Sequence, residues 1–384
     1  MKDFYYYQPT EIYFGQNQFE RLAEITKKYG DSALLVTRDS DTMNNFAVAA
    51  KKMLEEAGIA TALFNGVQPN PTTDSIDVGS QMAVDHNANV IIGLGGGSSM
   101  DAAKAIAVQA THEGSCWDYL FFKKEPTKKT LPIVAVTTTS GTGSHVTQVS
   151  VITNSAARDK SALYHPNIFP KSSIVDPVLM RTVPADITAQ TGFDAFCHSF
   201  ESLLHPNCSP YVEIMAKKAI QLVVQHLPTA ITHGDNLEAR EALALADTFA
   251  GLCIAAAGVT LPHGIAMAIG GMYPQVPHGR ALAINYPAFV SFTYKHAVKE
   301  FAFLARALDA KLAQADDQEA AANCRQALEA FFATTGLNVR LSDYDVPHNE
   351  LDKLAEQSMV LPDYKSNPRV ATLAEMREIL EEVY

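Results

Sequence analysis

Short apolar runs alternate with amphipathic stretches along the first half of the chain. The runs at 32–37, 60–64, 89–97 and 132–139 predict strands, and the stretches between them have helical periodicity. Strand–helix alternation at this spacing predicts a parallel sheet with helices on both faces. Three later runs, VSVIT, KSALY and SSIVD, predict further short strands.

The pattern changes near Val178. From there to the C-terminus, Ala-, Leu- and Glu-rich helical patterns dominate and are broken by Pro or Gly. A chain of 384 residues also suits two cores better than one. We therefore predict an α/β domain over 1–178 and an all-helical domain over 179–384.

Composition narrows the classes of partner. A net charge of −12 argues against nucleic acid and anionic membrane surfaces, and no apolar run approaches the ~20 residues that span a bilayer. The N-terminus lacks the apolar core of a signal peptide, and the five scattered cysteines suggest no disulfide framework. We expect a cytoplasmic protein. The Tyr-rich stretch over 4–15 could pair across the edge of a homodimer or simply form a packed first strand.

The segment GLGGGSSMDAAKA is the strongest candidate for nucleotide binding. A strand runs into glycines and Ser98 then opens a helix, so that free backbone amides at the helix N-terminus would form an anion site. Ser98 and Ser99 add hydroxyl donors and could cap the helix. The spacing differs from the usual dinucleotide fingerprint, and a glycine turn needed only for packing is the alternative. A second small-polar loop, TTTSGTGSHVT (137–147), follows the next strand and could close over a pyrophosphate or ribose.

Arg38 and Asp39 follow the first strand, where doubly wound folds often bind the adenosine ribose. An acidic group there bonds the ribose 2′-hydroxyl, and a cation accommodates a 2′-phosphate. The two residues offer both, so NAD and NADP both remain open, and a solvated loop is the alternative for either residue.

Four residues in the second half have the chemistry of metal ligands. Asp194 and His198 are four apart in a helical segment and so share one face, while His263 and His278 each follow a proline. Three imidazoles and one carboxylate suit a divalent transition metal. The alternative is four unrelated residues.

Together these segments, with PNPT (69–72), PHGRALAINYP (277–287) and NPR (367–369), resemble the iron-containing alcohol dehydrogenase family of the dehydroquinate synthase-like superfold. The resemblance implies an NAD(P)-binding α/β domain, a helical metal-binding domain and a cleft between them. It implies Fe(II), sometimes replaced by zinc, bound by Asp194, His198, His263 and His278. It implies cofactor contacts from Asn70, Gly95, Gly96, Gly97, Ser98, Ser99, Thr138, Thr139, Thr142, Thr147, Val149 and Lys160.

The chain departs from the family pattern at several positions. His145 stands where the family usually has an acidic residue, and Met267 stands where it often has a second histidine. One residue is inserted before the second PHG, and the NAD-preferring members tend to have aspartate where Arg38 stands. Met267 cannot transfer a proton, so the resemblance leaves the substrate pocket and the proton path open.

The expected activity is hydride transfer between NAD(P)(H) and a small primary alcohol or diol, or its aldehyde, with a metal that polarises the oxygen. A polyol or sugar-phosphate dehydrogenase or lyase of the same superfold is an alternative. It should need clustered cations, yet only Lys217, Lys218, Arg240 and Arg280 are basic between 186 and 290. A mononuclear metallohydrolase would leave both small-polar loops unused, and a non-catalytic sensing module is the remaining alternative.

Overall fold

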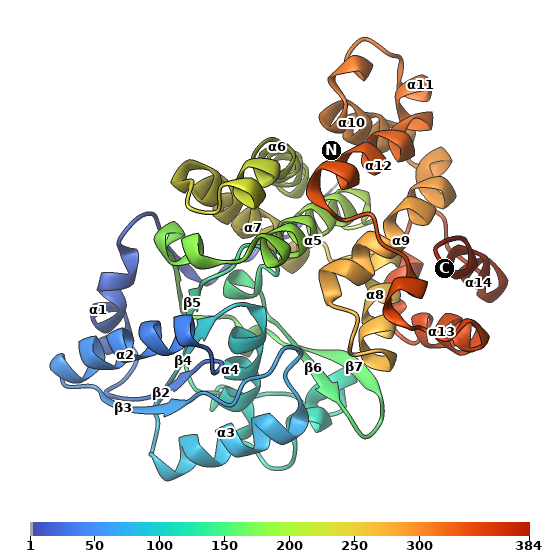
Figure 1. Ribbon diagram of the computed structural model, residues 1–384. Helices are drawn as coiled ribbons and strands as arrows, with labels where there is room; N and C mark the ends of the chain where they lie inside the picture. The colour runs from blue at the N-terminus through green and yellow to red at the C-terminus, as the bar shows by residue number, and fades with distance from the viewer. Residues whose placement is uncertain (1–2) are drawn as a thin grey trace. The chain divides into compact units, whose positions relative to one another are not determined.

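The computed structural model describes residues 3–384, which form two compact units (Figure 1). One unit is Tyr7–Val183, and the other is Pro184–Tyr384 together with residues 3–6. The division therefore falls shortly after the boundary expected near 178. Residues 3–6 join the helical unit because the rings of Phe4 and Tyr6 pack on Tyr211, with ring centroids 5.7 and 5.4 Å apart.

The first unit contains a six-stranded sheet in the order β1-β8-β5-β4-β2-β3. Every neighbouring pair is parallel, as the alternation of strands and helices predicts. The strands are β1 (Glu11–Phe14), β2 (Ser32–Val36), β3 (Ala60–Phe64), β4 (Val90–Gly95), β5 (Ile133–Thr137) and β8 (Ser172–Val175).

Alternate side chains of these strands supply two separate cores. Leu34 and Ile91 pack with α3 (Thr73–Asp85) and α4 (Gly97–Gln109) on one face. Leu35 and Ile92 pack with α1 (Leu22–Lys27) and α2 (Asp41–Glu56) on the other. Because both faces are covered, the central strands are apolar throughout rather than alternating.

The runs VSVIT and KSALY are strands, but they lie outside this sheet. They form β6 (Val149–Asn154) and β7 (Asp159–Tyr164), which pair with each other in antiparallel register. The prediction of further strands is thus confirmed, while their separation into a hairpin is a feature that the run pattern does not reveal.

The second unit is helical, as predicted. Most residues of α5 are buried, including Asp194 and His198. Its apolar core joins residues from Ala189 to Val383. The helices are α5 (Ala185–Leu204), α6 (Pro210–Thr232), α7 (Leu237–Ala256), α8 (Leu261–Met272), α9 (His278–Thr293), α10 (Val298–Leu308), α11 (Asp317–Ala322), α12 (Cys324–Thr335), α13 (Leu351–Ser358) and α14 (Leu373–Glu382).

Within residues 3–384, no helix by itself has the length and apolar character needed to cross a bilayer. Only α7 and α8 taken together meet that requirement, and the chain bends by 99° between them.

Candidate metal and cofactor sites

Three acidic or imidazole side chains of α5 share one buried face. Asp194, His198 and Glu201 are spaced by four and three residues, and their exposed fractions are 4%, 6% and 0%. This spacing places them one turn apart along the helix. The expectation that Asp194 and His198 share a face is confirmed.

Two further histidines come from the starts of two other helices. His263 lies in the first turn of α8 after Pro262, and His278 is the first residue of α9 after Pro277. Proline is compatible with both positions because the first turn of a helix has no partner for its N–H groups.

The Asp194 carboxylate lies at the centre of the three imidazoles. Its Oδ1 atom is 3.6 Å from His198 Nε2, 3.5 Å from His263 Nε2 and 3.8 Å from His278 Nε2. The rings of His198 and His263 are stacked with centroids 4.5 Å apart. One ligand atom each from Asp194, His263 and His278 lies within 4.8 Å of the others.

These atoms fit a metal ion. Asp194 Oδ1 and His263 Nε2 are buried and have no hydrogen-bond partner among the described residues. Leaving a buried polar atom unsatisfied costs about 1–3 kcal/mol. A shared cation would offset that cost for both atoms, and a set of imidazole nitrogens with one carboxylate oxygen suits Fe(II) or Zn(II).

Glu201 fixes the orientation of His263, a role that the sequence reasoning missed. Its Oε1 accepts a hydrogen bond from His263 Nδ1 at 2.7 Å, and its Oε2 accepts one from the Thr260 backbone N–H at 2.8 Å. Donation from Nδ1 directs His263 Nε2 away from Glu201, where it could bind an ion, an arrangement common behind metal-bound histidines. The sequence gives one indication of this role, because Glu201 follows Asp194 by seven positions and so lies on the same helix face.

The carboxylates also change the protonation of the metal-free site. Burial lowers the pKa of His263, but Glu201 and Asp194 outweigh it and raise the pKa to about 10. Burial raises the pKa of Asp194, but His198 and the other two imidazoles lower it to about 2. Without metal, His263 is therefore an imidazolium beside the ionised Asp194 carboxylate at neutral pH.

We expect metal binding to release this proton. The apparent Kd for Zn(II) should fall about tenfold per pH unit between pH 7.5 and 9, because His263 must lose its Nε2 proton before it can bind the ion. Calorimetric titration at pH 8 in buffers of different ionisation enthalpy would count the protons. Glu201→Gln should reduce the count, and a binding enthalpy independent of buffer in the wild type would contradict the expectation.

The two small-polar loops of the first unit meet, a contact that the sequence analysis did not predict. β4 and β5 are adjacent, with Gly95 opposite Thr137. A Cβ added to Gly96 would lie 3.0 Å from Thr139 Oγ1, and one added to Gly97 would lie 2.5 Å from Thr142 Cγ2. The glycine loop is therefore pressed against the second loop, and no side chain fits between them.

The start of α4 differs from the expectation in one respect. The helix begins at Gly97 with Gly96 as its N-cap residue, and no side chain caps it. The prediction that Ser98 or Ser99 could cap this helix is therefore wrong. Ser98 Oγ instead accepts a hydrogen bond from the Asn70 N–H, and Ser99 packs against Gly95, whose φ of +148° requires glycine. With no side-chain cap, the first amides of α4 are available for an anion.

A buried lysine braces the second loop from the same helix. Lys104 Nζ, which is fully buried, donates to the Ser144 carbonyl at 2.7 Å, to Thr147 Oγ1 at 3.3 Å and to the Val149 carbonyl at 2.6 Å. Asp101 accepts from Ser144 Oγ at 2.6 Å and from the Val151 N–H at 3.1 Å. Burial lowers the pKa of Lys104 to about 8. The Asp101–Lys104 pair was not singled out in the sequence, although both lie in an otherwise small and apolar helix.

The other predicted cofactor residues lie around these loops. Asn70, at φ +57°, accepts a hydrogen bond from Lys160 Nζ at 2.8 Å. Thr138 is buried beside Met43. Arg38 and Asp39 are exposed after β2, and Asp39 Oδ1 accepts from Asn44 Nδ2 at 2.8 Å. Asn70, Lys160 and Ser98 are thus brought together by the PNPT turn.

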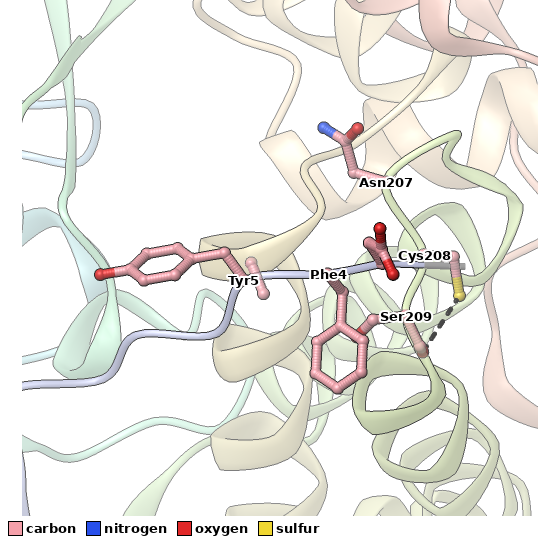
Figure 2. Close-up of a pocket in the computed structure, with 7 residues that line it drawn as sticks. Phe4, Tyr5, Asn207, Cys208 and Ser209 are labelled. Carbon is pink, nitrogen blue, oxygen red and sulfur yellow. Dashed lines mark hydrogen bonds between the residues drawn. The ribbon is translucent and has the colours of Figure 1, made fainter. Parts of the chain in front are cut away.

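A pocket elsewhere in the helical unit is separate from the predicted sites (Figure 2). Figure 2 shows Phe4 beside the Asn207–Ser209 loop and the ring of Tyr5 pointing away from it. None of the predicted metal or cofactor residues lines this pocket.

Comparison with known proteins identifies the family. The model of the iron-containing alcohol dehydrogenases matches residues 9–177, and that of the C-terminal part of the Fe-containing alcohol dehydrogenase family matches residues 188–384. The chain belongs to the iron-containing alcohol dehydrogenase family. It is therefore an enzyme, and it transfers hydride between a nicotinamide cofactor and an alcohol or aldehyde.

Relatives within the iron-containing alcohol dehydrogenases cover nearly the whole chain. The NAD-dependent methanol dehydrogenase of Bacillus methanolicus is 31% identical over 98% of both chains. The 1,3-propanediol dehydrogenase of Citrobacter freundii is 32% identical over 99% of both. The solved structure of an archaeal halo-thermophilic alcohol dehydrogenase from a Red Sea brine pool is 34% identical, with a TM-score of 0.95 and complete coverage of both chains.

Proposed function

We propose that this enzyme interconverts small primary alcohols or diols and their aldehydes, using NAD(P)(H) and an Fe(II) ion that zinc can replace. The observation that carries the metal assignment is the convergence of three imidazoles on the buried, unsatisfied Oδ1 of Asp194. Asp194, His198, His263 and His278 would hold the ion. The ion would supply Lewis acidity toward the alcohol or carbonyl oxygen.

The remaining residues have defined tasks in this proposal. Glu201 holds His263 with its Nε2 atom directed to the ion. The pyrophosphate binds along Gly95–Ser99, where β4 ends and α4 begins, with Asn70 and Lys160 beside it. Thr138, Thr139, Thr142, Thr147 and Val149 line the ribose and nicotinamide positions, and Lys104 holds the last two in place.

The charges of the helical unit support a small uncharged substrate. Arg280 pairs with Asp186, Lys217 Nζ lies 2.5 Å from Glu213 Oε1, and Arg240 donates to the Gly234 carbonyl and to Thr188 Oγ1. Three of the four cations between 186 and 290 are therefore already engaged. This argues against a phosphate-bearing substrate, and the relatives named for methanol and 1,3-propanediol point the same way.

Absorbance at 340 nm tests the proposal directly. Iron-loaded protein should oxidise NADH or NADPH when C2–C4 aldehydes are added, and should lose this activity on chelation and regain it with Fe(II). Sugar phosphates at equal concentration should be poor substrates. Turnover of a sugar phosphate but of no simple aldehyde would overturn the substrate class.

We predict that NADPH is accepted at least as well as NADH. Both residues are exposed, but Asp39 accepts a hydrogen bond from Asn44, whereas Arg38 could hold a 2′-phosphate with a charge-assisted contact. Arg38→Asp should move the ratio of kcat/KM values toward NADH by at least ~10-fold, or ~1.4 kcal/mol. A wild type strongly selective for NADH and unaffected by this change would assign the ribose contact to another group.

We further propose a cytoplasmic homodimer. β1 is an edge strand of the sheet, so its outer edge is open to a second copy. None of the five cysteines forms a disulfide within the described residues, in keeping with a reducing compartment. Light scattering of the purified protein would give the mass of the assembly.

A further inference from the structure

We propose that Gly279 and Arg280 are positioning residues, which pack the first turn of α9 against α5 and so hold His278 beside Asp194. The inference rests on the proposed role of His278 as a metal ligand. Gly279 and Arg280 would fix the helix that carries His278 relative to the helix that carries Asp194.

The chain contains two Pro-His-Gly triplets, and the two glycines have different surroundings. A Cβ added to Gly279 would lie 2.5 Å from the Gln190 carbonyl oxygen and 2.8 Å from its carbonyl carbon. A Cβ added to Gly264 would meet nothing closer than the Ser358 carbonyl oxygen at 3.6 Å, an ordinary contact. Only the glycine after His278 is therefore required for close packing.

The contact at Gly279 involves the backbone of α5 itself. Gln190 lies one helical turn before Asp194, so its carbonyl moves with the carboxylate that forms the centre of the metal site. A side chain could turn away from an added methyl group, but a helix backbone cannot. To restore an ordinary contact of 3.4 Å or more from 2.5 Å, α9 would have to move away from α5.

Arg280 also links α9 to α5, next to the contact at Gly279. Its guanidinium pairs with Asp186 in the first turn of α5 and donates to the Gly336 carbonyl at the end of α12. Asp186 also accepts from Gln190 Nε2 at 2.7 Å. The first turn of α9 thus contacts two successive turns of α5, at Asp186 and at Gln190.

His263 is attached to α5 in a different way. Its link is the side-chain hydrogen bond to Glu201, which can follow small shifts of α8. His278 instead depends on a backbone contact, and its Nε2 lies 3.8 Å from Asp194 Oδ1. Metal–ligand distances tolerate deviations of only about 0.2 Å, so a displaced α9 would weaken the site.

The test compares Gly279→Ala with its matched control Gly264→Ala. Zn(II) affinity is measured by competition with a chromophoric chelator, and the ligand geometry by the visible spectrum of Co(II)-loaded protein. Gly279→Ala should bind Zn(II) about 10- to 100-fold more weakly, the usual effect of disturbing the surroundings of a ligand, and should change the Co(II) spectrum. Gly264→Ala should match the wild type in both. Metal-free unfolding temperatures report whether each variant folds.

The outcomes separate this inference from the proposed function. Folded Gly279→Ala with wild-type Zn(II) affinity and Co(II) spectrum would overturn the role of Gly279. If this variant does not fold, Arg280→Met decides, with an expected loss of about 10-fold and an unchanged affinity as the contrary result. His278→Ala tests the ligand assignment itself: wild-type Zn(II) binding in that variant would overturn the metal site, and the inference with it.

Discussion

Replacing His263 by alanine is expected to remove most of the bound metal and to lower kcat/KM by at least about 10³-fold, or about 4 kcal/mol. The substitution deletes one of the proposed ligands and also leaves the fully buried Glu201 carboxylate without its imidazole partner. A buried charge that loses its partner is costly, so the metal-free variant should also unfold at a lower temperature.

Metal content by elemental analysis and NADH binding by fluorescence are the measurements. NADH binding should be largely retained, because the predicted cofactor residues belong to the other compact unit. His296→Ala, an exposed histidine of the helical unit, is the control and should keep both metal and activity. The metal content and activity of Glu201→Gln should lie between those of His263→Ala and those of His296→Ala. An amide oxygen accepts a hydrogen bond from His263 less strongly than a carboxylate does. Full activity in metal-free His263→Ala protein would overturn the metal assignment.

Replacing Gly97 by alanine is expected to raise the KM for the cofactor about 100-fold while leaving the metal in place. The added Cβ would lie 2.5 Å from Thr142 Cγ2 and 2.9 Å from Thr142 Cβ, so it must push the glycine loop and the second loop apart. A displacement of about 1 Å in a binding site can cost about 100-fold.

Gly79→Ala is the matched control in the same unit. Its Cβ would lie 2.4 Å from Ile106 Cδ1, a clash of similar size with the end of a flexible side chain in the core. It should lower the unfolding temperature without changing the cofactor KM. If Gly97→Ala binds NADH and NADPH as the wild type does, the glycine loop serves packing alone.

The sheet was predictable because its strands are buried on both faces. Runs such as those around Ile91 and Val134 are apolar throughout, a pattern typical of central parallel strands. The order of the strands in the sheet was harder to predict from the sequence. β8 lies between β1 and β5, and its run of four residues contains Ser172 and Ser173, so its place depends on long-range pairing.

The metal-ligand candidates were predictable from residue type, but their surroundings were not. Spacing within a helix brings Asp194, His198 and Glu201 together, yet only the fold shows that Glu201 meets His263. Asp363, in the short helical turn Pro362–Ser366, packs over Gly264, and burial raises its pKa to about 6. No local pattern links these two positions, which are far apart along the chain.

The imidazolium–carboxylate pair of His263 and Glu201 also has a consequence for how the enzyme matures. In the metal-free protein, the imidazolium of His263 lies 2.7 Å from Glu201 Oε1 and 3.5 Å from Asp194 Oδ1, so both buried carboxylates have a cationic partner without an ion. Binding of the proposed ion would therefore exchange one cation, the His263 proton, for another.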